Sequence, residues 1–251
     1  MTNAFTSSER LLLALREMIG SAPWIVEIPV PGAIALAFEI PRDAEARRAA
    51  ALAFLLPTEK ARHEKTDRSH QDSFLFGRAS LRHMLATSIG LAASKLEFEV
   101  SPQGKPSLAS IPAFFNVSHS GTWVALAFSE NHSVGIDIEA ERETPRAHGL
   151  ARRFFDPSEA AYIESLQGTV ARDAFLRMWT AKESLIKARG GAIPTDLPKE
   201  RIQVPFTAEI HPVGNGAKLV EIRGIPAIYG HVAVLGHVAV LGQVAVLDQG
   251  P

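Results

Sequence analysis

The sequence predicts an α+β fold made of two subdomains. Patterns typical of helices and strands alternate along the 251 residues, and a group of strands with one or two helices occurs twice. No Ser/Gly-rich linker separates the two groups, so we expect the subdomains to pack closely. We place the division near Phe114, with an N-terminal subdomain at residues 1–113 and a C-terminal subdomain at residues 114–251.

The N-terminal half is predicted to begin with an amphipathic helix, because Thr6 and Glu9 have the spacing of a capping box. Strands follow at residues 24–30 and 33–40, a charged helix at 58–68, a more apolar helix at 74–89 and a short strand at 96–100. Pro31 and Gly32 mark the turn between the first two strands. Gly90 is a natural stop for the helix that precedes it.

The C-terminal half is predicted to begin with strands at residues 114–118, 122–129 and 133–140. Asp156, Pro157 and Glu159 then indicate a helix start, with a capping carboxylate, proline at the first position and an acidic residue at the third. A long helix is expected at about 170–189, ending at Gly190 and Gly191. Further strands are predicted at 201–210, at 218–223 and in the tail.

Three near-identical hexapeptides occupy residues 230–247 of that tail. Eighteen residues are too few for a β-helix, so we interpret them as a final strand whose coding segment was duplicated. We expect one copy to complete the second sheet, and the others to extend it or pack outside. Because six is even, a shift by one copy keeps Val232, Val234, Val238 and Val240 on one face.

The composition excludes several classes of function. With 26 basic and 27 acidic residues, the net charge of −1 provides no overall field that would attract nucleic acid or an anionic membrane, so we expect neither partner. The chain has no cysteine, which excludes disulfides and thiolate metal sites and fits a reducing compartment. Charged residues at positions 9, 10, 16 and 17 flank the short apolar stretch at 11–15, so we do not interpret it as a signal peptide, and we expect a cytoplasmic protein.

Two carboxylates share one face of a predicted strand. Residues 134–139 alternate with period two, so Asp137 and Glu139 point to the same side. Such a pair is repulsive unless a cation lies between the two groups, and oxygen ligands suit Mg²⁺ or Mn²⁺ better than zinc. A solvated face of an edge strand would produce the same pattern, so the spacing alone leaves both interpretations open.

The long helix carries charged residues beside an apolar stripe. Lys182 falls inside the stripe, where a lysine must either extend to solvent or meet a specific anion. Glu183 and Lys187 lie one turn apart at its edge, and alone they would indicate an ordinary ion pair worth a few tenths of a kcal/mol.

A short polar turn ends the strand that starts near Phe114. Ser118, His119 and the backbone of this turn are able to present a hydroxyl, an imidazole and N–H groups to a phosphate, although single histidines are more often structural. The sequence contains no Gly-rich phosphate loop, no dinucleotide fingerprint and no serine-hydrolase elbow.

Together these motifs resemble the Sfp-type phosphopantetheinyl transferases, in the same order and with similar spacing. The main motifs are Asn116-Val117-Ser118-His119-Ser120-Gly121, Val134-Gly135-Ile136-Asp137-Ile138-Glu139, and Trp179-Thr180-Ala181-Lys182-Glu183 with Lys187. Supporting stretches are Phe74-Leu75-Phe76-Gly77-Arg78 with Leu81-Arg82, Gly104-Lys105-Pro106, and Arg153-Phe154-Phe155 with Glu159. The resemblance extends from about Leu55 to Pro205 and implies a pseudo-dimer of two similar subdomains, each a small antiparallel sheet packed with helices. It implies a monomer with coenzyme A in the cleft between the subdomains.

The resemblance also implies roles for individual residues. Asp137, Glu139 and Glu183 would hold Mg²⁺ against the diphosphate of coenzyme A, and Lys187, with Lys182 from the same motif, would neutralise its charge. Ser118 and His119 would contact a phosphate of coenzyme A, Lys105 and Pro106 would border the nucleotide, and Lys60, with His63 as a second basic residue, would reach the 3′-phosphate. Glu183, or a water activated by it and the metal, would take the proton of the attacking serine.

The activity implied by the resemblance is transfer of 4′-phosphopantetheine from coenzyme A to a serine of an apo carrier protein, with release of adenosine 3′,5′-bisphosphate. Fatty-acid, polyketide and nonribosomal-peptide carriers all fit. The alternatives are a different Mg²⁺-dependent phosphoryl-transfer enzyme and a non-catalytic module that binds a carrier protein or coenzyme A. The second would be expected to have lost a metal carboxylate or the motif lysine, and all four are present.

Overall fold

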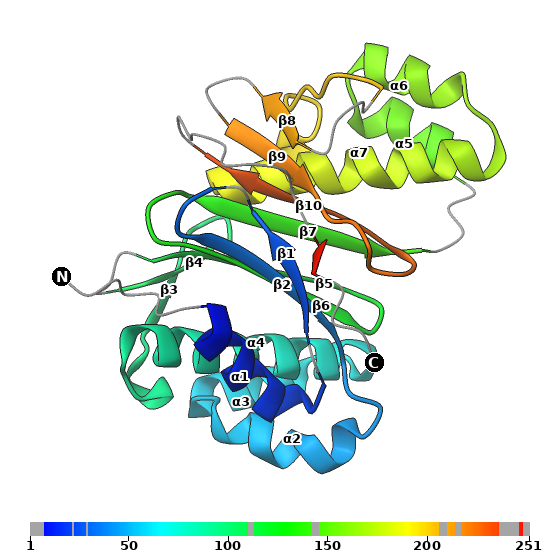
Figure 1. Ribbon diagram of the computed structural model, residues 1–251. Helices are drawn as coiled ribbons and strands as arrows, with labels where there is room; N and C mark the ends of the chain where they lie inside the picture. The colour runs from blue at the N-terminus through cyan, green and yellow to red at the C-terminus, as the bar shows by residue number, and fades with distance from the viewer. Residues whose placement is uncertain are drawn as a thin grey trace.

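Two antiparallel β-sheets face each other between two layers of helices in a computed structural model of the chain (Figure 1). The structure describes residues 8–21, 23–28, 30–109, 113–141, 146–205, 210–213, 217–235 and 246–247. Within these residues the first sheet has the strand order β11-β1-β2-β6-β5 and the second β7-β10-β9-β8, and β3 and β4 form a separate hairpin. The predicted fold class is therefore confirmed.

The first sheet and the helices on its outer face come mainly from the N-terminal half. Their elements are α1 (Ser8–Ile19), β1 (Trp24–Glu27), β2 (Ala33–Glu39), α2 (Ala44–Ala53), α3 (Pro57–Lys65), α4 (Arg68–Ile89), a 3₁₀ turn (Ala93–Lys95), β3 (Phe98–Val100), β4 (Pro106–Leu108), β5 (Phe114–Ser120) and β6 (Trp123–Ser129). Gly90 ends α4 with φ 68°, as predicted, because this left-handed conformation suits glycine. Thr6 of the predicted capping box lies outside the described residues.

The second sheet is covered by the long helix α7 on its outer face (Figure 1). Its elements are β7 (Val134–Ala140), α5 (Ala147–Phe154), α6 (Pro157–Glu164), α7 (Gly168–Arg189), α8 (Ile193–Asp196), β8 (Ile210–Val213), β9 (Ala217–Glu221) and β10 (Ile228–Val234). The predicted start of α6 is confirmed: Asp156 accepts from the Ser158 N–H, and Glu159 accepts from the Asp156 N–H. The prediction of a strand at 201–210 is wrong for residues 201–205, which do not form a β-strand.

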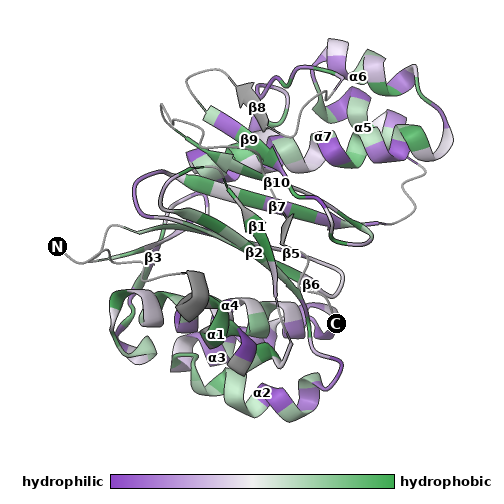
Figure 2. Ribbon diagram, viewed as in Figure 1, coloured by the Kyte–Doolittle hydropathy of each residue, from purple (hydrophilic) through white to green (hydrophobic). Residues whose placement is uncertain are grey.

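Apolar side chains fill the space between the sheets. One buried cluster contains Ala35 and Ala37 of β2, Ile136 and Ile138 of β7, and Val232 of β10. Figure 2 shows these facing strands as predominantly hydrophobic. The burial of this layer is the main attraction between the halves.

The strand pairing crosses the division that the sequence suggested near Phe114. β5 and β6 follow that point in the chain, yet β6 pairs with β2 along its whole length and β5 pairs with β6. The chain passes from the first sheet to the second between Ser129 and Val134.

The first and last copies of the hexapeptide contribute strands to different sheets. The first copy lies in β10, between β7 and β9, so one copy is part of the second sheet as predicted. Val232 and Val234 are both buried there. The end of the last copy forms β11 (Val246–Leu247), which pairs with β1 at the edge of the first sheet. Val238 and Val240 lie outside the described residues.

A glycine permits unusually close contact between β7 and α7. A Cβ atom at Gly135 would lie 2.1 Å from the carbonyl oxygen of Ser184 and 2.4 Å from the amide nitrogen of Ala188. Both atoms belong to the helix backbone and are unable to turn aside as a side chain would. Gly135 therefore sets the distance between the turn of α7 that carries Glu183 and Lys187 and the part of β7 that carries Asp137 and Glu139.

We predict that Gly135→Ala lowers the free energy of unfolding by about 1–3 kcal/mol or more, because the helix must shift as a unit to make room for the methyl group. Gly149→Ala in α5 is the matched control: a Cβ there meets nothing within 4 Å, so we expect a neutral or slightly stabilising effect. Urea unfolding of both variants measures the difference. Equal stabilities for the two variants would contradict the close-contact explanation.

Candidate functional site

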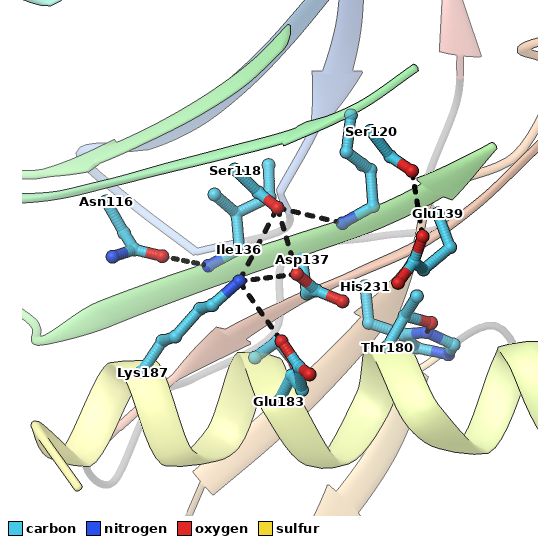
Figure 3. Close-up of polar contacts among 12 residues, drawn as sticks. Asn116, Ser118, Ser120, Ile136, Asp137, Glu139, Thr180, Glu183, Lys187 and His231 are labelled. Carbon is cyan, nitrogen blue, oxygen red and sulfur yellow. Dashed lines mark hydrogen bonds and ion pairs between the residues drawn. The ribbon is translucent and has the colours of Figure 1, made fainter. Parts of the chain in front are cut away.

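The acidic residues that the sequence placed on β7 and α7 come together in the structure. Lys187 joins them: its Nζ lies 2.5 Å from Oδ1 of Asp137 and 3.4 Å from Oε2 of Glu183 (Figure 3). Asp137 is 3% exposed, so its carboxylate is buried beside this ammonium group. Glu139 lies two residues further along the same strand, on the same face. The sequence alone gave no reason for α7 to lie against β7, and the contact at Gly135 provides one.

Polar side chains of β5 hold β7 in place. The backbone N–H groups of Ile136, Ile138 and Ala140 donate, respectively, to Asn116 Oδ1 (2.9 Å), Ser118 Oγ (3.3 Å) and Ser120 Oγ (3.0 Å). Two of the same hydroxyls also donate to the acidic residues, Ser118 to Asp137 at 2.9 Å and Ser120 to Glu139 at 2.8 Å (Figure 3). Each carboxylate on β7 is thus oriented by a serine on β5.

The charges in this cluster shift one another's titration. Burial raises the pKa of Glu183 to about 7, and the negative charge of Asp137 adds to the rise, while Lys187 opposes it. For Lys187, burial works to lower the pKa, but the attraction of Asp137 and Glu183 outweighs it, and the net shift is upward. Near neutral pH, Lys187 is therefore charged, and Glu183 is poised between its two protonation states.

The carboxylates of Asp137, Glu139 and Glu183 are the type of ligand that suits a hard divalent cation. Among the described residues, no three acidic or imidazole groups meet the geometry of a metal site. However, Oδ2 of Asp137 is buried and has no hydrogen-bond partner, which is costly unless a ligand uses it. Mg²⁺ prefers oxygen ligands, and in proteins it is usually bound by one or two carboxylates together with waters and phosphate oxygens of the substrate. The residues therefore fit a magnesium ion.

A basic cleft of about 510 Å³ opens beside the carboxylates. Among its lining residues are five that carry cationic or imidazole groups: Arg62, Arg78, Lys105, His119 and Lys187. Pro106, which the sequence suggested as a border of the nucleotide, lines it too. The lining is suited to an anionic ligand that reaches from the N-terminal helices to the turn of α7 containing Lys187.

Lys105 is fixed by the end of α7. Its Nζ donates to the carbonyl oxygen of Ala188 at 2.8 Å and to Ser133 Oγ at 3.1 Å. Burial lowers the pKa of Lys105 to about 8. The amino group therefore ties the β3–β4 hairpin to α7, and the stem of Lys105 forms part of the cleft wall.

Ser118 and His119 point to opposite faces of β5, because side chains alternate along a strand. Ser118 is buried against Asp137, whereas His119 lines the cleft and lies near His70 of α4, with 6.4 Å between ring centroids. Desolvation lowers the pKa of His119, with further lowering from His70 and Lys187. His119 is therefore placed to meet a ligand in the cleft, and Ser118 is placed to orient a carboxylate.

The prediction that Lys182 contacts the coenzyme is wrong. Its side chain is fully buried; its Nζ pairs with Glu159 at 2.6 Å and donates to the carbonyl oxygens of Leu197 (3.0 Å) and Glu200. The specific anion that a lysine in an apolar stripe requires is thus supplied by the protein itself.

The basic residue that α3 presents to the cleft is Arg62. Lys60 and His63, which the sequence suggested, do not line it, and His63 stacks on Phe74 instead. Residues 60 and 62 point to different sides of a helix, and the sequence did not show which side of α3 would face the cleft. Arg78 is a further cleft residue, and its signal was its place in the Phe-Leu-Phe-Gly-Arg stretch.

Comparison with known proteins identifies related families for both halves. Residues 133–223 match the model described as the 4′-phosphopantetheinyl transferase superfamily, and residues 41–131 match the model described as 4′-phosphopantetheinyl transferase, N-terminal. The two matches meet between β6 and β7, where the chain passes from one sheet to the other. This tandem arrangement agrees with the predicted pseudo-dimer, and the predicted resemblance is confirmed.

Individual relatives carry the same description. A putative 4′-phosphopantetheinyl transferase of Synechocystis sp. is 37% identical over 145 residues, which are 56% of this chain and 59% of the relative. HetI of Nostoc sp. is 35% identical over 142 residues (55% and 59%), and Sfp of Bacillus subtilis is 32% identical over 141 residues (56% and 59%). The chain thus spans about three-fifths of the length of these curated relatives. Across the described residues, no helix combines the length and apolar character needed to cross a bilayer.

We predict that Glu183→Gln stabilises the metal-free protein at pH 8 by about 1–3 kcal/mol but has little effect at pH 5. Glu183 titrates near pH 7 in the folded chain and near 4.5 when unfolded, so the cost of its buried charge grows between these values and is complete above pH 7. Glutamine stays neutral at both pH values. Urea unfolding in the presence of a chelator measures the effect, and a difference that does not increase with pH would contradict the raised pKa.

Proposed function

Because the chain belongs to the 4′-phosphopantetheinyl transferase superfamily, we propose that it transfers the 4′-phosphopantetheine group of coenzyme A to a serine of an apo acyl or peptidyl carrier protein. Adenosine 3′,5′-bisphosphate is the other product. The observation that carries the proposal is the junction of a basic cleft with a buried carboxylate cluster, at Lys187. The cleft matches the several phosphates of coenzyme A, and the carboxylates match a metal that would accompany its diphosphate.

We assign the metal to Asp137, Glu139 and Glu183. The unpartnered Oδ2 of Asp137 favours a bound cation, and so does the position of Glu183, whose pKa is raised by burial and then by the nearby charge of Asp137. Mg²⁺ held there would supply positive charge to the diphosphate and to the oxygen that leaves with the nucleotide.

The remaining steps use side chains of this chain. The carrier serine attacks the phosphorus next to the pantetheine, and the bond from that phosphorus to the bridging oxygen breaks. Lys187, which lines the cleft, is placed to stabilise the negative charge that develops on the diphosphate. Glu183, or a water activated by it and the metal, would accept the proton of the serine. Arg62, Arg78 and His119 are available to the other phosphates in the cleft.

The subdomain organisation follows from the same proposal. We place the division at residues 130–133, where the chain leaves β6 and enters the second sheet, rather than near Phe114. His119 then comes from one subdomain and Lys187 from the other, so a single chain provides both walls of the cleft. A monomer is therefore sufficient for activity.

The proposed reaction is tested by incubating the protein with coenzyme A, Mg²⁺ and an apo acyl carrier protein and then measuring the mass of the carrier. We expect the mass to increase by one phosphopantetheine group. A binding module would leave the carrier unmodified, and another phosphoryl-transfer enzyme would not add this group. An unmodified carrier with each of several apo acyl and peptidyl carriers would overturn the proposal.

We predict that Lys187→Ala and Glu183→Ala each slow the transfer by about 100-fold or more, because each removes a group that acts on the reacting atoms. Lys199→Ala is the matched control, since Lys199 is exposed and pairs only with nearby Asp196 in a surface contact. It should keep the wild-type rate. Single-turnover rates from carrier mass spectra provide the measurement, and a wild-type rate for Glu183→Ala would refute its assigned roles.

A further inference from the structure

We propose that Ser120 is a positioning residue that aims the carboxylate of Glu139 into the metal site, as one rung of a polar ladder between β5 and β7. The inference rests on the proposed function and deepens it. Ser120 Oγ donates to Glu139 Oε2 at 2.8 Å and accepts the Ala140 N–H at 3.0 Å.

The ladder exists because β5 and β7 lie side by side at the edges of different sheets. The N–H groups of Ile136, Ile138 and Ala140 donate to side chains of β5 at residues 116, 118 and 120. Both sets of numbers rise in steps of two, so the strands run in the same direction and alternate side chains of β5 act as acceptors. A shift of either strand by one residue would break every rung.

A serine hydroxyl on such a rung has a fixed direction. It has one hydrogen and accepts through its lone pairs, so when Ser120 Oγ accepts the Ala140 N–H, its own hydrogen is free for Glu139. Ser118 is used in the same way toward Asp137. Hydrogen bonds to both partners therefore fix the rotamer of each serine and the carboxylate it contacts.

The residue types along the ladder match this role. Each serine rung accepts the N–H of the residue that follows a carboxylate and donates to that carboxylate. The corresponding residue beside the Asn116 rung is Gly135, which has no side chain to orient. Asparagine, which accepts the N–H without needing a hydroxyl, occupies that rung. Serine thus occurs on the rungs that have a carboxylate to aim.

A substitution at Ser120 is able to separate an effect on the position of Glu139 from an effect on folding. Asn116 and Ser118 are each only 6% exposed, so removing either leaves a buried N–H without an acceptor. Ser120, Glu139 and Ala140 are only partly buried, so water is able to replace the lost acceptor. Ser120→Ala should therefore fold, while Glu139 loses its hydrogen bond from Ser120.

The experiment compares wild type, Ser120→Ala, Ser120→Thr and Asn116→Ala. Binding of Mn²⁺ to each protein alone is measured by electron paramagnetic resonance, and transfer from coenzyme A to an apo acyl carrier protein is measured against Mg²⁺ concentration. We expect Ser120→Ala to bind Mn²⁺ about 10-fold more weakly and to need correspondingly more Mg²⁺ for half-maximal rate. Ser120→Thr, which keeps the hydroxyl, should restore both values. Asn116→Ala should lower the melting temperature without weakening Mn²⁺ binding.

The outcomes separate this inference from the proposed function. If wild type binds Mn²⁺ and modifies the carrier while Ser120→Ala matches it in both assays, the positioning role is overturned and the function stands. Equal weakening of Mn²⁺ binding in Ser120→Ala and Asn116→Ala would also overturn it, because the ladder would then act only through stability. A wild type that neither binds Mn²⁺ nor modifies a carrier would overturn the function and this inference with it.

Discussion

The close contact of α7 with β7 at Gly135 is the constraint on which the site depends. A helix held away from the sheet by an intervening side chain would keep Glu183 and Lys187 too far from Asp137 to share charge with it. At Gly135 the backbones themselves meet, and the charged turn of the helix lies directly over the acidic strand. Burial, together with the charge of Asp137, raises the pKa of Glu183. The pKa of Lys187 rises because the attraction of the nearby Asp137 and Glu183 carboxylates outweighs the opposing effect of burial.

A second constraint lies on the other side of β7. An edge strand presents N–H groups that are costly to bury without acceptors, roughly 1–3 kcal/mol for each unmet group. Asn116, Ser118 and Ser120 provide acceptors from side chains, so the two sheets join where no backbone pairing links them. The same solution brings hydroxyl groups to the carboxylates. The site therefore lies where the edge strand β5 of the first sheet meets the edge strand β7 of the second sheet.

Local signals in the sequence were sufficient for much of the fold and for part of the site. Gly90 and the Asp156–Glu159 box mark their helix ends through chemistry that acts within a few residues, and the alternation around Asp137 fixes a shared face in any strand. The orientation of α3 depends instead on tertiary packing, which is why Arg62 rather than Lys60 lines the cleft. The division between subdomains is difficult to place from the sequence for a similar reason, since it depends on which distant strand β5 and β6 pair with.

Lys182 shows how one motif serves both folding and chemistry. It adjoins Glu183 in the sequence, but a turn of about 100° per residue directs its ammonium group toward Glu159 instead. Glu159 also accepts the N–H groups of Asp156 and Ile202, so this carboxylate joins the start of α6, the middle of α7 and the segment after α8. Removing one partner of a buried pair leaves an uncompensated charge, which costs far more than the pair contributes when intact. A lysine at this position is therefore explained by packing alone: it ties α7 to Glu159, while the adjacent Glu183 pairs with Lys187 one turn further along the helix.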